Sequence, residues 1–251
     1  MNLSLETSAV IFFALLFGAV TKGVTGFGLP MVAVPLLSGI LGVERAVVVM
    51  VIPTFVSNAQ LMWEHRRQAS AAWQHLPLFL AAGVVGTFAG TTLLTVLSER
   101  TLVLILAGWL GLYLLTQALH PSLLRVPRRG RTPLTLGVGT AAGVLQGSMG
   151  VPGPIVATWF HALRLEPATY VFSVCAVFFL TAGVQILSLA NLGLWSTERL
   201  VEGLLALVPS VIGIPLGVRL ARRIDARMFN WCLLGVLGLT EIRLIWQGLL
   251  E

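Results

Sequence analysis

Long apolar runs separated by short polar turns make up most of the chain. The first run covers residues 10–41, and three more follow at 43–63, 76–97 and 101–119. The runs lack the period-2 alternation of half-buried strands, so the pattern predicts apolar helices. Because lipid offers the backbone no hydrogen-bond partners, runs of this length predict an all-α, polytopic membrane protein.

The first run is interrupted by a stretch rich in glycine and proline, Gly23-Val24-Thr25-Gly26-Phe27-Gly28-Leu29-Pro30. A related stretch, Gly147-Ser148-Met149-Gly150-Val151-Pro152-Gly153-Pro154, follows in the second half of the chain. Glycine costs about 1 kcal/mol and proline about 3 kcal/mol inside a helix, so both stretches predict breaks. Two broken apolar segments at matching places in two halves of a chain are typical of a transporter binding site.

The second half of the chain repeats the first. At an offset of 124, the residues that match are Val20, Gly23, Gly26, Pro30, Val32 and Ala33 with Val144, Gly147, Gly150, Pro154, Val156 and Ala157. At an offset of 127, they include Gly86, Gly90, Leu93 and Arg100 with Gly213, Gly217, Leu220 and Arg227. The matches predict one membrane transport domain over 1–251 built by duplication, with repeats at 5–119 and 134–250 and a linker at 120–133. The glycine pairs have the small-xxx-small spacing that lets helices approach closely.

The distribution of arginine predicts that the two repeats are inverted. The loop after the second run is basic (Arg66-Arg67), whereas its counterpart at 190–198 has no lysine or arginine. The bias reverses in the next pair, since 98–100 is nearly neutral and 222–227 holds three arginines. Basic loops stay cytoplasmic, so equivalent loops lie on opposite sides. We therefore expect a re-entrant helical hairpin plus three transmembrane helices in each repeat, with a cytoplasmic linker and both termini outside. The alternative to the re-entrant hairpin is a broken helix that crosses the membrane.

Composition agrees with a membrane protein and excludes several soluble classes. The 251 residues are 57% hydrophobic and only 10% charged, against about 25% charged in soluble proteins. A net charge of +6 is a nucleic-acid signal in a soluble domain, but here the arginines cluster in short loops between apolar runs. We expect no nucleic-acid partner. The predicted location is the cell (inner) membrane, which the chain crosses several times.

The broken segments have the chemistry of an anion site. Pro30 and Pro154 are suited to open the second limb of each hairpin, because proline fits the first turn of a helix. Such half-helix N-termini present free N–H groups and about half a positive charge, and glycines beside them can form an anion-holding nest. Two inverted copies would face each other near the membrane midplane. The predicted substrate-binding residues are Lys22, Gly23, Thr25, Gly26, Phe27, Gly28, Pro30, Gln146, Gly147, Ser148, Met149, Gly150, Pro152 and Pro154.

Lys22 is the cation beside this site, and Gln146 is its counterpart in the second repeat. A lysine deep in an apolar run indicates function, although snorkelling to an interface is the alternative. Three further polar residues in apolar runs, Asn58, Gln60 and Gln185, are candidates to flank the hairpins; hydrogen bonding between helices explains them equally well.

At these residues the chain resembles the sulfite exporter TauE/SafE family of membrane anion permeases. The resemblance rests on Gly23-x-x-Gly26-Phe27-Gly28-x-Pro30, on the second copy from Gly143 to Pro154, and on the eight apolar segments, so it spans essentially the whole chain. It implies a secondary transporter, often an exporter, of sulfite, organosulfonates or other sulfur-containing anions. The second copy, Gly150-Val-Pro-Gly-Pro, departs from the expected pattern by its extra proline, which puts the geometry of that half-site in doubt.

Other functions are weaker explanations of the sequence. Gly147-Ser148-Met149-Gly150 lacks the first glycine of a Gly-x-Ser-x-Gly elbow, which Gln146 replaces, so an enzyme is not expected. Duplication with broken helices also fits an anion channel or a structural membrane protein. We expect no cofactor and no metal; the expected partners are a small anion and the lipid bilayer. A coupling proton or sodium ion and a homo-oligomer stay open.

Overall fold

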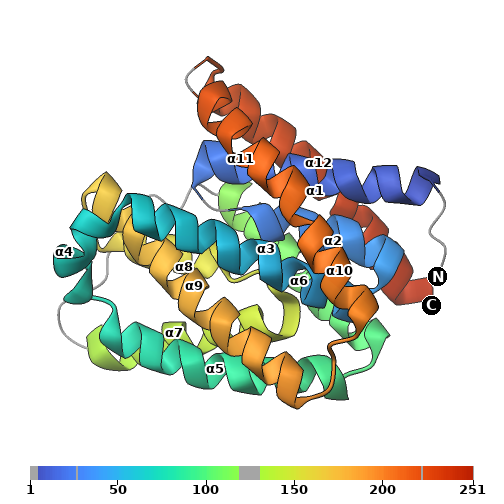
Figure 1. The fold of residues 1–251 in the computed structure, drawn as a ribbon, viewed down its shortest axis with the longest axis horizontal. Coiled ribbons are helices and arrows are strands. Elements are labelled where there is room, and N and C mark those ends of the chain that lie inside the picture. Colours follow the sequence, from blue (N-terminus) through green and yellow to red (C-terminus); the bar gives the residue numbers. More distant parts are fainter. Residues whose placement is uncertain (1–4, 27, 119–130, 222, 251) are drawn as a thin grey trace. The chain divides into compact units, whose positions relative to one another are not determined.

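The computed structural model describes residues 5–26, 28–118, 131–221 and 223–250, and these residues form helices without any strand (Figure 1). In chain order the helices are α1 (Leu5–Thr25), α2 (Leu29–Leu41), α3 (Val43–Glu64), the 3-10 turn η1 (Arg66–Gln68), α4 (Ala69–Trp73), α5 (Pro77–Val96), α6 (Glu99–Ala118), α7 (Arg131–Met149), α8 (Gly153–Ala162), α9 (Pro167–Asn191), α10 (Thr197–Leu205), α11 (Leu207–Ala221) and α12 (Ala226–Leu250). The all-α prediction is confirmed. Most of the linker predicted at 120–133 lies outside the described residues.

Six of the described segments are long and apolar enough to cross a membrane. They are Val43–Glu64, Pro77–Val96, Glu99–Gln117, Pro167–Asn191, Thr197–Ala221 and Trp231–Leu249. Three belong to each half of the sequence, as the predicted topology requires. Ala9–Thr25 and Leu29–Leu41, on either side of the first break, are shorter apolar helices.

The chain divides into two compact units, and each draws on both halves of the sequence. Unit 1 comprises Met1–Met50, Leu97–Pro121 and Glu198–Glu251, and unit 2 comprises Val51–Val96 and Ser122–Thr197. Unit 1 therefore joins α1 and α2 from the first half to α11 and α12 from the second. Unit 2 joins α5 from the first half to α7, α8 and α9.

In unit 1, α1 packs closely along α11. A methyl group on Gly213 would lie 2.6 Å from the Ala19 Cβ atom, and one on Gly217 would collide with the carbonyl oxygen of Val20. Because later residues of α11 meet later residues of α1, the two helices run parallel. Glycine is required at these positions, since any side chain would push the two backbones apart.

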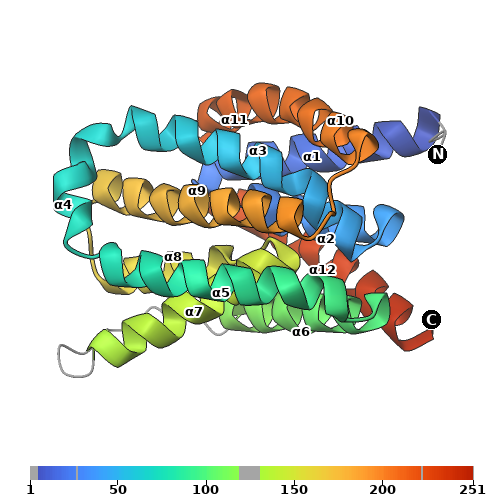
Figure 2. The same ribbon diagram turned by 60° about the horizontal axis from the view of Figure 1, so that its bottom comes forward.

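In unit 2, α5 and α7 pack in the same manner, and Figure 2 shows them side by side. A methyl group on Gly86 would collide with the carbonyl oxygen of Thr140, and one on Gly90 with that of Val144. A methyl group on Gly139 would lie 2.9 Å from the carbonyl oxygen of Phe79, near the beginning of α5. Here too, later residues of α7 meet later residues of α5, so the two helices run parallel.

The two helix pairs use equivalent residues. Gly86 and Gly90 correspond to Gly213 and Gly217 at the offset of 127, and their contact partner Val144 corresponds to Val20 at the offset of 124. The predicted close approach of helices at these glycines is confirmed. The recurrence of the same contacts in both units supports the duplication, and the inverted orientation of the repeats stays a prediction.

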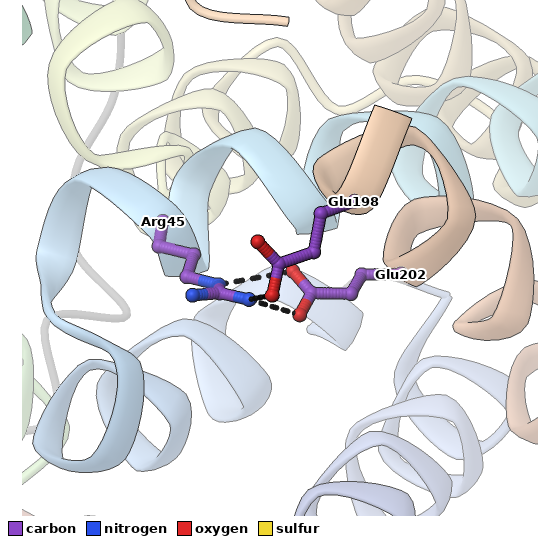
Figure 3. Close-up of polar contacts among 3 residues, drawn as sticks. All are labelled: Arg45, Glu198 and Glu202. Carbon is purple, nitrogen blue, oxygen red and sulfur yellow. Dashed lines mark hydrogen bonds and ion pairs between the residues drawn. The ribbon is translucent and has the colours of Figure 1, made fainter. Parts of the chain in front are cut away.

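Charged side chains join the beginnings of three helices at one end of unit 1. Figure 3 shows Arg45, in the first turn of α3, facing two glutamates of α10: its Nη2 atom donates to Glu198 at 2.8 Å and its Nε atom to Glu202 at 3.0 Å. Arg199 of α10 donates in turn to Glu44 at 2.7 Å. The Glu99 carboxylate, at the start of α6, accepts the backbone N–H of Val43 at 2.6 Å. These contacts agree with a topology in which α3, α6 and α10 enter the membrane from the same side.

We expect the parallel helix pairs to tolerate no side chain at their contact glycines. Gly90→Ala and Gly217→Ala should each lower stability by about 1–3 kcal/mol, because the added methyl group meets backbone that cannot move aside. Gly108→Ala, on α6 where no atom lies within 4 Å of the added group, is the control and should be neutral or stabilising. Melting temperatures of the purified variants in detergent measure the effect; equal values for all three variants would show that these helices are not in close contact.

Candidate functional site

The first break forms a tight turn between α1 and α2 in unit 1. Gly26 and Gly28 have φ angles of 81° and 122°, which side-chain-bearing residues rarely adopt. The N–H of Gly26 donates to the carbonyl oxygen of Lys22 at 2.8 Å and closes the end of α1. Pro30 lies in the first turn of α2, as predicted. Phe27, also predicted to bind substrate, lies outside the described residues.

Lys22 lies in the last turn of α1 and is only 2% exposed. It is the only lysine in the 251-residue sequence. A buried ammonium group in an apolar segment is costly and needs negative charge or several oxygen atoms around it. Its burial weakens the alternative that Lys22 snorkels to an interface.

Two other residues predicted for this half-site have structural roles of their own. Gly23 packs against α11, because a methyl group there would lie 2.8 Å from the Cα atom of Gly217. The Thr25 hydroxyl donates to the carbonyl oxygen of Thr21 at 2.8 Å, within the same helix. Gly23 therefore serves helix packing, and the Thr25 hydroxyl already donates its proton to the backbone of α1.

The second break forms a corresponding turn between α7 and α8 in unit 2. Gly150 has a φ angle of 70°, and its N–H donates to the carbonyl oxygen of Gln146 at 2.9 Å, as Gly26 does to Lys22. Pro152 directly precedes α8, and Pro154 lies in its first turn. The predicted role of Pro30 and Pro154 at helix starts is thus confirmed in both hairpins.

Gly147 and Ser148 behave like their counterparts in the first hairpin. A methyl group on Gly147 would lie 2.8 Å from the backbone carbon of Gly90, so this glycine also serves packing, here against α5. The Ser148 hydroxyl donates to the carbonyl oxygen of Val144 at 2.7 Å. Met149 is 1% exposed and ends α7.

A chain of two side-chain amides reaches the second hairpin from α9. The Nε2 atom of Gln185 donates to the carbonyl oxygen of Gly147 at 3.1 Å, and the Nε2 atom of Gln146 donates to Oε1 of Gln185 at 2.7 Å. Both side chains are fully buried, with exposures of 0% and 1%. A carbonyl oxygen only accepts hydrogen bonds, so Gly147 fixes the orientation of the Gln185 amide, and Gln185 in turn fixes that of Gln146.

These two hydrogen bonds leave one acceptor atom of the amide pair without a partner. The Oε1 atom of Gln146 is buried and has no hydrogen-bond partner. Buried polar atoms without a partner are rare in folded proteins, and each one needs an explanation. Where the first hairpin carries a cation, the second therefore presents a carbonyl oxygen that lacks a donor.

Of the three flanking candidates, the structure brings Gln185 to a hairpin. Asn58 is buried and its Nδ2 atom donates to Thr54 within α3 at 2.7 Å. Gln60 is exposed, and its Nε2 atom donates to Glu64 at 3.0 Å, one turn along the same helix. Each of these bonds uses one amide N–H within α3, and a role of Asn58 or Gln60 beside the hairpins stays a prediction.

An apolar cavity of about 330 Å³ lies in unit 1. Its wall includes Leu15 of α1, Leu41 of α2 and Pro209 of α11, with Glu202 as its charged member. It contains no residue predicted to bind substrate, and its chemistry suits hydrocarbon rather than a small anion.

Comparison with known families agrees with the architecture. The family model described as sulfite exporter TauE/SafE matches residues 10–244, which is nearly the whole chain. The chain belongs to the sulfite exporter TauE/SafE family. No curated protein and no solved structure matched the chain in the two other comparisons.

Membership in the TauE/SafE family has direct consequences for function. The protein is a membrane transporter of the sulfite-exporter type and not an enzyme. The match includes both hairpins and all six apolar segments long enough to cross a membrane, apart from the last residues of α12. The protein is therefore a multi-pass membrane protein with an anionic substrate and a lipid environment.

We expect the amide chain to stabilise the second hairpin. Gln185→Met keeps the length of the side chain but leaves the Gly147 carbonyl and the Gln146 amide unpaired, which should cost about 1–3 kcal/mol. Gln60→Met removes an exposed glutamine and should change stability by less than about 0.5 kcal/mol. The two melting temperatures in the same detergent provide the comparison, and an unchanged value for Gln185→Met would contradict the buried chain.

Proposed function

We propose that the protein is a secondary transporter that works as an exporter of sulfite, an organosulfonate or another small sulfur-containing oxyanion. It works by alternating access in the cell (inner) membrane, and residues of the two helical hairpins bind the solute. The single observation that carries this proposal is Lys22, a buried ammonium group directly before a helix break in a chain of this family.

The surroundings of Lys22 in unit 1 favour a negative solute. The turn at Gly26 and Gly28 is followed by the N-terminus of α2, where the first backbone N–H groups have no partner within the helix. The helix dipole adds about half a positive charge at this end. A solute anion can thus be held by one side-chain charge and backbone donors, without the desolvation cost of several buried arginines.

The second hairpin supports a more specific proposal about the solute. The unpaired Oε1 atom of Gln146 repels a bare anion and pairs with a hydrogen-bond donor. An anionic solute that pairs with Gln146 therefore carries an O–H or N–H group as well as its negative charge. Hydrogensulfite and hydroxy- or amino-substituted sulfonates have this chemistry, whereas sulfate and simple alkanesulfonates lack a donor at neutral pH.

Anion binding should depend on Lys22. Lys22→Gln removes the buried charge, so the rise in melting temperature that sulfite or hydroxyethanesulfonate causes in the wild type should disappear. Arg219→Gln removes an exposed cation from α11 in the same unit and is the matched control, for which the rise should persist. The panel contains sulfite, sulfate, thiosulfate, hydroxyethanesulfonate, taurine and acetate.

The outcomes of this panel separate several explanations. If sulfite or hydroxyethanesulfonate stabilises Lys22→Gln as much as the wild type, the protein still binds its anion but the transport site does not include Lys22. No response to any anion contradicts the anion proposal. Flux measurements on proteoliposomes address the mechanism, since saturable exchange supports alternating access, and a large ohmic current would indicate a channel.

The second hairpin should select solutes that carry a donor. Hydroxyethanesulfonate and propane-1-sulfonate have the same charge and nearly the same size, but only the first has an O–H group. The wild type should bind hydroxyethanesulfonate about tenfold more tightly, which corresponds to one hydrogen bond. Gln146→Met should bind the two sulfonates equally, whereas Gln60→Met should keep the preference. Equal binding by the wild type would contradict the role of Gln146 and leave that of Lys22 standing.

A further inference from the structure

Unit 2 contains a second, partly polar cavity, at the end where α5 and α7 begin. Its volume is about 350 Å³. The wall includes Pro77 and Leu78 from the first turn of α5, Thr132 and Thr135 from the first turns of α7, and Trp159 from α8. Along α7, Thr135 lies eleven residues before Gln146, which corresponds to about 16 Å. The cavity is thus distinct from the hairpin turn.

Two helix N-termini meet at this cavity. Because α5 and α7 run parallel and in close contact, both helices begin at the same end of unit 2. The free N–H groups are those of Leu78 and Phe79 in α5 and of Thr132 and Leu134 in α7, because Pro77 and Pro133 have none. Each N-terminus also carries about half a positive charge. Parallel helices add these charges instead of cancelling them, so this end of unit 2 attracts negative groups.

Trp159 supplies an independent observation. The residue is 5% exposed, and its Nε1 atom is buried without a hydrogen-bond partner. The indole N–H is a donor only, and Trp195, by comparison, donates its N–H to the carbonyl oxygen of Ile186 at 3.2 Å. The Trp159 ring is held by Phe79 of α5, at 6.2 Å between ring centroids. A fixed, buried donor beside two helix N-termini requires an acceptor.

We propose that this cavity binds a tetrahedral oxyanion, either a free sulfate or phosphate ion or the phosphate of a lipid headgroup. The oxygen atoms of such a group accept hydrogen bonds in several directions at once. They can therefore satisfy the Trp159 indole, the first N–H groups of α5 and α7, and the Thr132 hydroxyl together. The site is separate from the proposed transport site and does not need Lys22 or Gln146.

The first test uses lipid-free protein in an uncharged detergent. Sodium sulfate and sodium phosphate, compared with sodium chloride at equal ionic strength, should raise the melting temperature of the wild type. Trp159→Phe keeps the ring and removes the donor, so the apparent Kd should rise about tenfold. Trp246→Phe, at an exposed position of α12, is the control and should bind like the wild type.

Two further arms separate this site from others. Lys22→Gln should keep the stabilisation by phosphate; stabilisation that is lost in Lys22→Gln and kept in Trp159→Phe overturns the proposal and assigns the anion to the transport site. A short-chain phosphatidylglycerol is tested beside inorganic phosphate. If only the lipid stabilises the wild type and Trp159→Phe abolishes this, the site is assigned to a headgroup; if no oxyanion stabilises it, the proposal is wrong.

A spectroscopic measurement covers the case in which Trp159→Phe folds poorly. In protein labelled with 15N at tryptophan, the indole N–H resonance of Trp159 is the one missing from the spectrum of the variant, or of Trp159→Tyr. This resonance should move when sulfate, phosphate or the short-chain lipid binds, because its N–H gains an acceptor. A resonance that stays in place at saturating concentrations of all three ligands overturns the proposal.

Discussion

Backbone hydrogen bonding in an apolar environment is the constraint on which the rest of this structure depends. Each helix break frees N–H and C=O groups that lipid cannot satisfy, so protein has to cover it. The contact glycines bring a second helix against the last turns before each break: α11 meets Gly23, and α5 meets Gly147. The glycine spacing and the helix breaks therefore belong together, because a parallel helix packs against the end of each helix that is interrupted.

The two copies of this arrangement share their backbone and differ in chemistry. Both turns close with a glycine N–H bonded to the carbonyl oxygen four residues before it, and both second limbs carry a proline in their first turn. The side chain at that carbonyl is a lysine in one copy and a glutamine in the other. The two turns are thus equivalent scaffolds, and a single position in each decides whether the turn offers a positive charge or an acceptor.

The sequence was sufficient for features that depend on local chemistry, and insufficient for the choice of partners. Apolar runs, proline at helix starts and glycine spacing follow from backbone physics, so the helices and breaks were predictable. The pairing of α1 with α11 was not, because leucine, valine and alanine fit one another too uniformly to specify neighbours. Similarly, Gln185 and Gln60 look alike in the sequence. Only the packing of α9 against α7 brings one of them to Gly147 and leaves the other in a local bond.

In the transport site that we propose, a buried polar atom without a partner provides selectivity without tight binding. The buried acceptor Gln146 Oε1 costs about 1–3 kcal/mol of stability as long as it has no donor. A solute with a matching donor recovers that energy, and an analogue without one does not, so the discrimination comes from the protein's own unsatisfied group. Tight binding is not required for this selectivity. A transporter has to release its solute as readily as it takes it up, and a single unpaired acceptor meets both conditions better than a cluster of buried charges.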